Sequence, residues 1–414
     1  MKRILVVSWE MPPLSGPRAV QVTRTLRELA RSGWRSRVIC FGPRSNRYNQ
    51  DYRVSPDAET DGAVQLVKVA SPEEWLFFRA LWRVCPPIKR LPDEKRVWVG
   101  RAVAAARREL DAAPADLIVS FAQPWSSHLV GMRLHEETGL PWVAHFSDPW
   151  VDSPYLRGAG WQRRLWARME REVIAKAARV VFVNQQTADR VMAKYAGEWA
   201  ARARVVPQGY EPLARPPASE RVGGPLRIVY TGRFYDGLRT PDAFLRAIAA
   251  LQRHTAIDGR LAVEFVGGAM QRYERLAADL RLDGVVKFLG RRSPAGALAV
   301  ASTADVLLSI DAPADGPNLY LPSKLVDYLA LGKPILCLTA SEGASAELLK
   351  PFGYPIVDPT DSGAIAEEIW RLVRLKESGR LTPSPRHQEV ARRYDIRETT
   401  RRLQAVMEEA LNSV

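Results

Sequence analysis

Short apolar runs alternate with helical patterns along most of the chain. Residues 3–8 form an apolar run rich in β-branched side chains, and residues 19–32, after a proline- and glycine-bearing loop, carry apolar positions at helical spacing. Gly33 is placed to end this helix, and residues 36–42 are expected to form the next strand. A strand, a helix and a second strand in this order predict the first βαβ unit of a parallel sheet.

The same alternation continues on both sides of a segment rich in proline and glycine. In the first half, further strands are predicted at 64–69, 117–121, 142–146 and 180–184. Between 205 and 225 the frequent prolines and glycines favour a linker. After it, strands are predicted at 226–230, 262–266, 285–288, 306–310, 334–338 and 355–357, and helices at 241–254, 271–280, 296–301, 323–330, 344–349, 362–376 and 386–411.

These elements predict an α/β protein made of two Rossmann-like, doubly wound domains. A chain of 414 residues is too long for one ordinary domain and suits two. We place the domains at 1–208 and 209–389. Since ligands bind at the carboxyl ends of parallel strands, we expect the active site in a cleft where the two domains face each other.

Composition excludes several classes of protein. Apolar residues make up 46% and charged residues 26%, which disagrees with disordered, collagenous and coiled-coil chains. The three cysteines are far apart, with no arrangement typical of a disulfide framework or a zinc site. We see neither a signal peptide nor an apolar stretch long enough to span a membrane, so we expect a cytoplasmic protein.

The chain is basic, and the excess charge lies mainly in its first half. The net charge is +14, with 31 Lys and Arg against 21 Asp and Glu over 1–200, and 29 against 25 afterwards. Such a surface attracts nucleic acid, anionic lipid or phosphorylated ligands. Residues 73–90 and 160–168 mix tryptophan with arginine, as interfacial helices do, although buried aromatics beside solvated arginines would give the same pattern. No nucleic-acid-binding module is recognised, which disfavours that partner.

The richest candidate constellation lies within residues 318–335. Ser323 is expected to cap a helix whose amino terminus could hold phosphate, and Lys324 adds a cation in the first turn. Asp327 lies on nearly the same helical face and could accept hydrogen bonds from a ribose. The alternative is an ordinary capped helix with a solvated Lys/Asp pair.

The stretch 322–334 resembles the nucleotide-sugar signature of the family-4-type retaining glycosyltransferases, which have the GT-B fold. The resemblance implies that Asp327, in place of the more frequent glutamate, binds the ribose of the donor. It also implies that a final helix, about 390–414, returns to the first domain. Leu319 stands where the family has a second glutamate, and Asp311 or Asp315 could replace it or be solvated loop carboxylates.

Other stretches of the second half extend this resemblance. Residues 230–239 resemble the family's first strand and loop of the second domain. The resemblance implies that Gly232 lets the backbone approach the donor and that Arg233 and Arg239 bind its diphosphate, although a surface turn with two solvated arginines is the alternative. Residues 264–268 resemble the strand that ends beside the base pocket, with Gly267 at its end.

In the first domain the resemblance points to two loops. Gly16 and Arg18 follow the first strand, where the family has a loop beside the diphosphate and the acceptor; a solvated arginine in a bland loop is the alternative. Residues 142–150 resemble a strand-end tract of the family and place His145 and Asp148 near the reaction centre. Asp148 could take a proton from the acceptor or be a structural turn carboxylate, and the stretch 120–124 lacks a histidine that many relatives have.

Together these residues predict a retaining, metal-independent glycosyltransferase without a cofactor. The donor would be a nucleotide-diphosphate sugar, with Asp148, Arg233 and Lys324 as the catalytic candidates. The acceptor would be a glycan or polyprenyl-linked lipid of cell-surface polysaccharide or glycolipid synthesis, met at the inner face of the cytoplasmic membrane. A nucleotide-sugar epimerase of the same fold and a non-catalytic binding protein are the alternatives.

Overall fold

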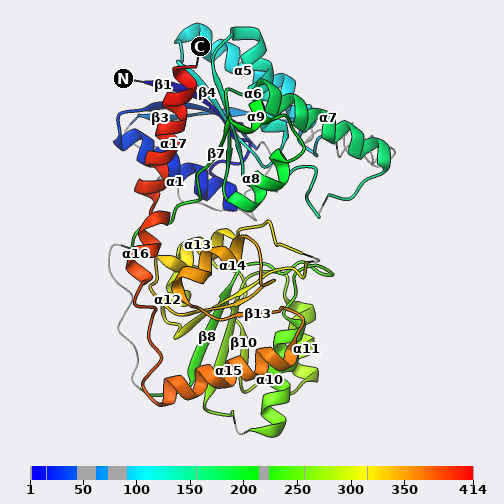
Figure 1. The fold of residues 1–414 in the computed structure, drawn as a ribbon, viewed down its shortest axis with the longest axis vertical. Helices are drawn as coiled ribbons and strands as arrows, with labels where there is room; N and C mark the ends of the chain where they lie inside the picture. The colour runs from blue at the N-terminus through cyan, green and yellow to red at the C-terminus, as the bar shows by residue number, and fades with distance from the viewer. Residues whose placement is uncertain are drawn as a thin grey trace. The chain divides into compact units, whose positions relative to one another are not determined.

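The chain forms two compact units in a computed structural model that describes residues 2–14, 16–43, 62–72, 91–154, 156–213, 223–255, 257–314 and 316–413 (Figure 1). The first unit consists of Met1–Gly209 and Ile396–Val414, and the second of Tyr210–Asp395. The chain leaves the first unit one residue after the predicted boundary and re-enters it at 396 rather than at about 390.

The first unit is built on a parallel sheet of seven strands in the order β3-β2-β1-β4-β5-β6-β7. The strands are β1 (Arg3–Val7), β2 (Arg35–Phe41), β3 (Val64–Val69), β4 (Leu117–Phe121), β5 (Trp142–Phe146), β6 (Arg179–Phe182) and β7 (Ala203–Val205). The sequence pattern did not predict β7, whose three residues are only partly buried and carry too short an apolar run to be recognised.

Helices cover both faces of this sheet because its strands are apolar on both sides. Alternate residues of β1 enter different cores, with Ile4 and Val6 in one and Leu5 and Val7 in the other. The first core packs against α1 (Pro17–Arg31) and α17 (Ile396–Leu411). The second packs against α5 (Val99–Ala112), α6 (Ser126–Thr138), α7 (Gly160–Lys176) and α8 (Gln185–Met192). A 3₁₀ turn (Arg96–Trp98) precedes α5, and the short α9 (Gly197–Ala200) precedes β7.

The second unit repeats this design with a parallel sheet of six strands in the order β10-β9-β8-β11-β12-β13. The strands are β8 (Leu226–Thr231), β9 (Leu261–Val266), β10 (Val286–Phe288), β11 (Val306–Ile310), β12 (Ile335–Leu338) and β13 (Ile356–Val357). The helices are α10 (Asp242–His254), α11 (Gln271–Asp279), α12 (Pro294–Ser302), α13 (Ser323–Leu329), α14 (Ala344–Leu349), α15 (Ser362–Glu377) and α16 (His387–Ala391), with 3₁₀ turns at Lys350–Phe352 and Arg392–Tyr394.

The strand order reverses direction once in each sheet. In the first unit the reversal lies between β1 and β4, and in the second between β8 and β11. At such a point the loops after neighbouring strands diverge to opposite faces and leave room for a ligand. The expected fold of two Rossmann-like domains is confirmed, and each reversal marks where a site is expected.

The predicted continuous helix over 386–411 is wrong, because the chain is extended at its middle. Asp395 has φ −62° and ψ 135° and separates the turn Arg392–Tyr394 from α17. The backbone N–H of Tyr210 donates to the carbonyl of Tyr394. The two chain segments that connect the units therefore hydrogen-bond to each other, through residues that belong to the second unit.

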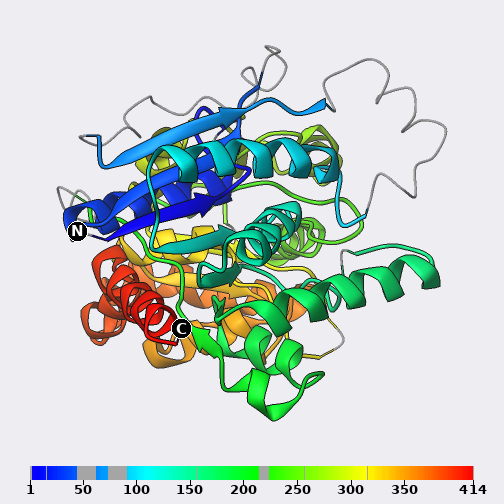
Figure 2. The ribbon, with the colours of Figure 1, turned by 90° about the horizontal axis from the view of Figure 1, so that it is seen from above.

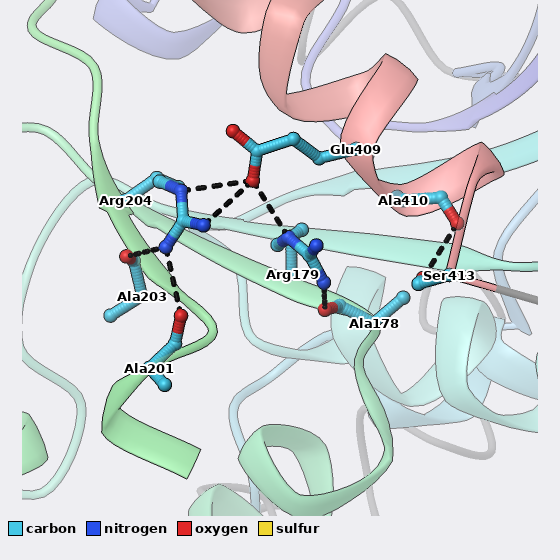
Figure 3. A network of polar contacts seen from close by, with 8 residues as sticks. All are labelled: Ala178, Arg179, Ala201, Ala203, Arg204, Glu409, Ala410 and Ser413. Carbon is cyan, nitrogen blue, oxygen red and sulfur yellow. Dashed lines mark hydrogen bonds and ion pairs between the residues drawn. The ribbon is translucent and has the colours of Figure 1, made fainter. Parts of the chain in front are cut away.

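The final helix α17 belongs to the first unit, as expected. Its apolar side packs on the sheet through Leu403, Met407 and neighbours. At its end Glu409 accepts hydrogen bonds from Arg179 Nε at 2.9 Å and from Arg204 Nε at 3.0 Å (Figure 3). Both arginines also donate to backbone carbonyls, so the carboxylate joins α17 to β6 and β7. None of the helices among the described residues is long and apolar enough to cross a membrane.

Candidate functional site

In the second unit, two glycine-bearing loops pack backbone against backbone. Gly232 follows β8 with φ +131°, a conformation that disfavours residues with a side chain. Its N–H donates to the carbonyl of Val266. A Cβ on Gly267 would lie 1.9 Å from the carbonyl oxygen of Gly232. Gly232 is therefore favoured by its positive φ, and Gly267 is required by the close approach of the two loops.

Lys324, on α13, extends toward the end of β8 and has no hydrogen-bond partner among the described residues. Its Nζ lies 3.5 Å from the centre of the Tyr230 ring, and the atom is buried without a hydrogen bond. Burial and the nearby charge of Arg239 hold the pKa of the amine well below its ordinary 10.5. An ammonium group held against an aromatic face with unused donors is suited to receive an anion.

The second predicted cation, Arg239, lies close to Lys324. Its Nη2 donates to the carbonyl of Arg233 at 2.9 Å, and its guanidinium lies over the ring of Tyr235, 4.8 Å from the centroid. Its Nε is buried without a partner. Arg233 contributes its carbonyl to this arrangement, while its side chain is exposed. The structure thus brings Lys324 and Arg239 together and does not bring the side chain of Arg233 to them.

A buried carboxylate, Asp311, lies near these two cations after β11. It is 3% exposed and accepts from Thr339 Oγ1 at 2.9 Å and Asn318 Nδ2 at 3.2 Å. Burial raises its pKa, and hydrogen bonds together with Lys324 and Arg239 oppose that rise. The expectation that Asp311 is solvated is wrong, since β11 ends inside the polar cluster; Asp315 lies outside the described residues.

The prediction that Ser323 caps α13 is wrong. Pro322, one residue earlier, is the N-cap, with φ −61° and ψ 128°, and no side chain caps the helix. Ser323 is instead the first helical residue, half-buried, and Asp327 is half-buried one turn later. With only seven residues, α13 offers its side chains, chiefly Lys324, rather than its amino terminus.

Sequence reasoning missed two tyrosines that position these groups. Tyr230 supplies the ring beneath Lys324 and donates to the carbonyl of Arg233 at 3.0 Å. The hydroxyl of Tyr328 accepts from the N–H of Thr231 at 2.9 Å and donates to the carbonyl of Leu308. Tyr328 therefore fastens α13 to the end of β8 and to the middle of β11. Its spacing of four residues from Lys324, on one side of a helix, was the available signal.

In the first unit, the loop after β1 is closed by a carboxylate of the chain itself. Gly16 is the N-cap of α1, and a Cβ there would lie 1.9 Å from Glu10 Oε1. The Glu10 carboxylate accepts backbone hydrogen bonds from Arg18 and Ala19. Burial raises the pKa of Glu10, and Arg18 opposes that rise. Glu10, missed by sequence reasoning, thus fills the space at the helix start that Gly16 leaves open.

Arg18 and Asp148 lie close together at the carboxyl ends of β1 and β5. Arg18 is 7% exposed, and its Nη2 is buried without a partner. Burial lowers its pKa to about 10, while Asp148 and Glu10 counteract the fall, so the guanidinium remains charged. Burial raises the pKa of Asp148, against the lowering effect of Arg18. Asp148 also accepts from Gln123 Nε2 at 3.2 Å and Ser147 Oγ at 3.0 Å.

His145 lies beside this pair and is uncharged at neutral pH. It is 7% exposed, its Nδ1 has no partner, and its ring packs against Phe121. Burial and the charge of Arg18 lower its pKa to about 3. Arg18 and His145 line one small pocket together with Gln21, Gln208 and Thr400. An imidazole with so low a pKa is a weak base, which leaves Asp148 as the stronger candidate for proton transfer.

The described residues contain no group of three His, Cys, Asp or Glu side chains placed to hold a metal ion. The basic, tryptophan-containing segment 73–90 lies outside the described residues.

Each unit therefore has cations and polar groups at the reversal point of a Rossmann-like sheet, as in proteins that bind nucleotides. Comparison with known families identifies the chain more closely. Residues 18–209 match the family described as Glycosyl transferase 4-like domain, and residues 225–374 match Glycosyl transferases group 1. The chain belongs to the group 1 glycosyltransferases of the GT-B fold.

Individual relatives agree with this assignment. The chain is 28% identical over 240 residues to a D-inositol 3-phosphate glycosyltransferase of Corynebacterium jeikeium (strain K411), a match that covers 53% of this chain and 55% of that protein. The chain thus aligns with about half the length of this curated relative. Sucrose-phosphate synthase from Thermosynechococcus elongatus has a similar structure, with TM-score 0.73, 17% identity and full coverage of both chains. So does a variant of TarM from S. aureus, in complex with fondaparinux, alpha-GlcNAc-glycerol and UDP, with TM-score 0.65, 9% identity and coverage of 100% and 99%.

Proposed function

We propose that this protein transfers a sugar from a nucleotide-diphosphate sugar, held by the second unit, to a hydroxyl of an acceptor held by the first. The observation that carries the proposal is the pair Lys324 and Arg239, whose Nζ and Nε are buried and without partners. Unsatisfied buried cationic donors are costly unless an anion engages them. A diphosphate supplies that anion, and the half-buried Asp327 would hold the ribose.

Lys324 and Arg239 would also stabilise the charge that appears as the sugar leaves. When the bond from the anomeric carbon to the diphosphate oxygen breaks, the electron pair stays on the diphosphate, and two fixed cations are matched to it. We propose that they do this without a metal ion, with Arg233 as a third cation from an exposed position. We propose Gly16 and Arg18 of the first unit, and Gly232 and Gly267 of the second, as further residues that contact the donor.

We propose that transfer retains the configuration of the sugar. The departing diphosphate would accept the proton of the acceptor hydroxyl on the face from which it leaves, so no protein nucleophile is needed. Asp148 would accept a hydrogen bond from that hydroxyl and orient it, assisted by Arg18, whose charge lies nearby. His145, neutral at pH 7, would contact the sugar or the acceptor as a hydrogen-bonding group.

The acceptor class that we propose is a glycan or polyprenyl-linked lipid of cell-surface polysaccharide or glycolipid synthesis. The named activity of the Corynebacterium relative, transfer to an inositol phosphate, supports a polyhydroxylated acceptor. The enzyme would then work in the cytoplasm at the inner face of the membrane. An epimerase would release an altered sugar without an acceptor, and a non-catalytic protein would bind the donor without turnover.

The test is a thermal-shift and calorimetric screen of UDP, GDP and ADP and their sugars. A ligand that binds only the native state at a hundred times its Kd stabilises it by about 2.7 kcal/mol. We expect one nucleotide series to raise the Tm of the wild type and to fail with Lys324→Ala and Asp327→Ala. Lys287→Ala, at an exposed lysine of β10, is the control and should respond as the wild type does.

Loss of binding in Lys287→Ala as well, or retained binding in Lys324→Ala, would contradict the assignment of the donor site. Turnover is then measured with the selected donor and a panel of acceptors, with and without a chelator. The anomeric configuration of the product decides between retention and inversion.

A further inference from the structure

The helix α7 carries an exposed basic and apolar face that no part of the proposed reaction uses. Among the described residues of the first unit, Trp161 and Leu165 are the large apolar side chains that remain exposed, at 46% and 37%. Arg164 and Arg168 are exposed beside them. The spacing of three, four and seven residues from Trp161 places all four on one side of the helix. This set, Trp161, Arg164, Leu165 and Arg168, is called the α7 face.

The other side of α7 is firmly packed, so the direction of the α7 face is fixed. Gln162, Trp166 and Glu170 are buried. Trp166 Nε1 donates to the carbonyl of Pro92, and Gln162 Oε1 accepts from the N–H of Ala159. Both views show α7 running outward from the sheet of the first unit (Figure 1 and Figure 2). Two large apolar side chains thus stay exposed at an outward-reaching element.

The charge around the α7 face is predominantly positive. From residue 153 to residue 169 the chain contains Arg157, Arg163, Arg164 and Arg168 and no acidic residue. Arg157, Arg163 and Arg164 are exposed, and no acidic side chain among the described residues pairs with them. The stretch ends at the buried Glu170, and Arg168 pairs with Glu172 at 2.9 Å, so Arg157, Arg163 and Arg164 carry its positive charge. An apolar pair within a basic field has the composition of a helix that lies on an anionic interface.

We propose that the α7 face binds the surface of a bilayer that contains anionic lipids. Trp161 and Leu165 enter the boundary between head groups and acyl chains, and the arginines pair with lipid phosphates. A second copy of the chain fits less well, because pairing two α7 faces would bring like charges together. Nucleic acid would bind the arginines but would leave the exposed Leu165 without an apolar contact. This inference rests on the proposed function only in that a lipid-linked acceptor would explain membrane binding. It is tested without donor or acceptor.

The experiment is co-sedimentation of the full chain with vesicles of phosphatidylcholine alone and of an equal mixture with phosphatidylglycerol. We expect binding to the mixed vesicles that weakens with salt, and little binding to the neutral ones. Each arginine near an anionic surface contributes about 1 kcal/mol, so Arg164→Gln should lower the partition coefficient about fivefold. Trp161→Ala with Leu165→Ala should lower it by at least roughly tenfold, from the lost apolar contact.

The matched control is Arg246→Gln, at an exposed arginine of α10, which should bind vesicles as the wild type does. Melting curves establish that each variant folds. The α7 variants should retain nucleotide binding, and Lys324→Ala should retain vesicle binding, which separates failure of this inference from failure of the proposed function.

Three results would overturn the inference. The first is absence of wild-type binding to mixed vesicles, and the second is equal binding by the wild type and the Trp161/Leu165 variant. The third is binding to a single-stranded oligonucleotide, or self-association in sedimentation velocity, that depends on the α7 face while vesicles are not bound.

Discussion

The two units place cations at the same end of similar sheets but surround them differently. In the first unit, Arg18 lies near two carboxylates, those of Glu10 and Asp148. In the second, Lys324 and Arg239 share the influence of one carboxylate, Asp311, whose hydrogen bonds go to Thr339 and Asn318. Two carboxylates surround one cation in the first unit, whereas two cations surround one carboxylate in the second.

This difference suggests how the work is divided between the units. Excess positive charge with unused donors is complementary to a diphosphate. A buried cation beside two carboxylates is better matched to a neutral hydroxyl, which needs a hydrogen-bond acceptor to orient it. The predictions below test whether the cations of the second unit bind the donor and the carboxylates of the first orient the acceptor.

The largest effect is expected for Lys324→Met. Loss of a cation that stabilises the leaving group should lower turnover by about two to three orders of magnitude. The same substitution removes a buried amine that has no hydrogen-bond partner among the described residues, so the ligand-free protein should become more stable, on the order of 1 kcal/mol. Steady-state kinetics and urea unfolding without ligand measure the two effects.

Opposite signs for activity and stability are what distinguish a binding lysine from a structural one. Lower stability of Lys324→Met in the absence of ligand would show that the amine has a structural partner. It would contradict the view that the second unit holds an unpaired cationic group for the donor. Lys287→Met, at an exposed position of β10, provides the reference for both measurements.

The lowered pKa of Lys324 gives a second test of the imbalance. Because burial and Arg239 favour the neutral amine, a bound diphosphate should raise the pKa and cause proton uptake. Affinity for UDP should fall as pH rises from the lowered pKa toward 10.5, the ordinary value. Calorimetry of UDP binding in buffers of different ionisation enthalpy should detect up to about one proton, which Lys324→Met should abolish. Equal proton uptake by both proteins would assign the proton to another group.

A somewhat smaller effect is expected for Asp148→Asn in the first unit. An amide accepts a hydrogen bond less strongly than a carboxylate and should orient the acceptor hydroxyl less well, so turnover should fall by about a hundredfold while affinity for the donor stays the same. Since burial raises the pKa of Asp148, wild-type activity should fall as pH drops through that raised value, and the variant should lose this limb. A lower donor affinity with an unchanged pH profile would instead mean that Asp148 is a structural residue.

Sequence reasoning predicted the fold almost completely because both sheets are buried on two faces. Their strands form nearly continuous apolar runs, each recognisable in the sequence, whereas the short, half-buried β7 and the break at Asp395 are not. For the site, the sequence identified charged residues near strand ends, but it did not show which side chains would surround them in the folded protein. Whether Asp311 is solvated, or which atoms face Gly16, depends on contacts between residues far apart in the sequence.

The next prediction concerns the glycines of the two units. Gly16 has φ −66°, so a Cβ there meets no backbone strain, and the three atoms nearest to it belong to the side chain of Glu10. Gly16→Ala should destabilise the protein by roughly 1–3 kcal/mol, and less in the presence of Glu10→Ala. Gly267→Ala would clash with the carbonyl of Gly232, which no side-chain substitution can relieve. Urea unfolding of the double-mutant cycle measures the coupling, and strictly additive effects would show that Glu10 does not occupy the space beside Gly16.

The smallest effect is expected where two arginines of the first unit donate hydrogen bonds to one carboxylate. Glu409 joins Arg179 and Arg204 to α17, and their hydrogen bonds outweigh burial and lower its pKa. Because the group is partly exposed, Glu409→Gln should destabilise the protein by only about 1 kcal/mol at neutral pH. The difference should vanish as pH falls through the lowered pKa, since both side chains are then uncharged. Glu408→Gln, which removes an exposed pair with Lys2, should change stability less; an equal loss would mean that the two arginines gain nothing from sharing one carboxylate.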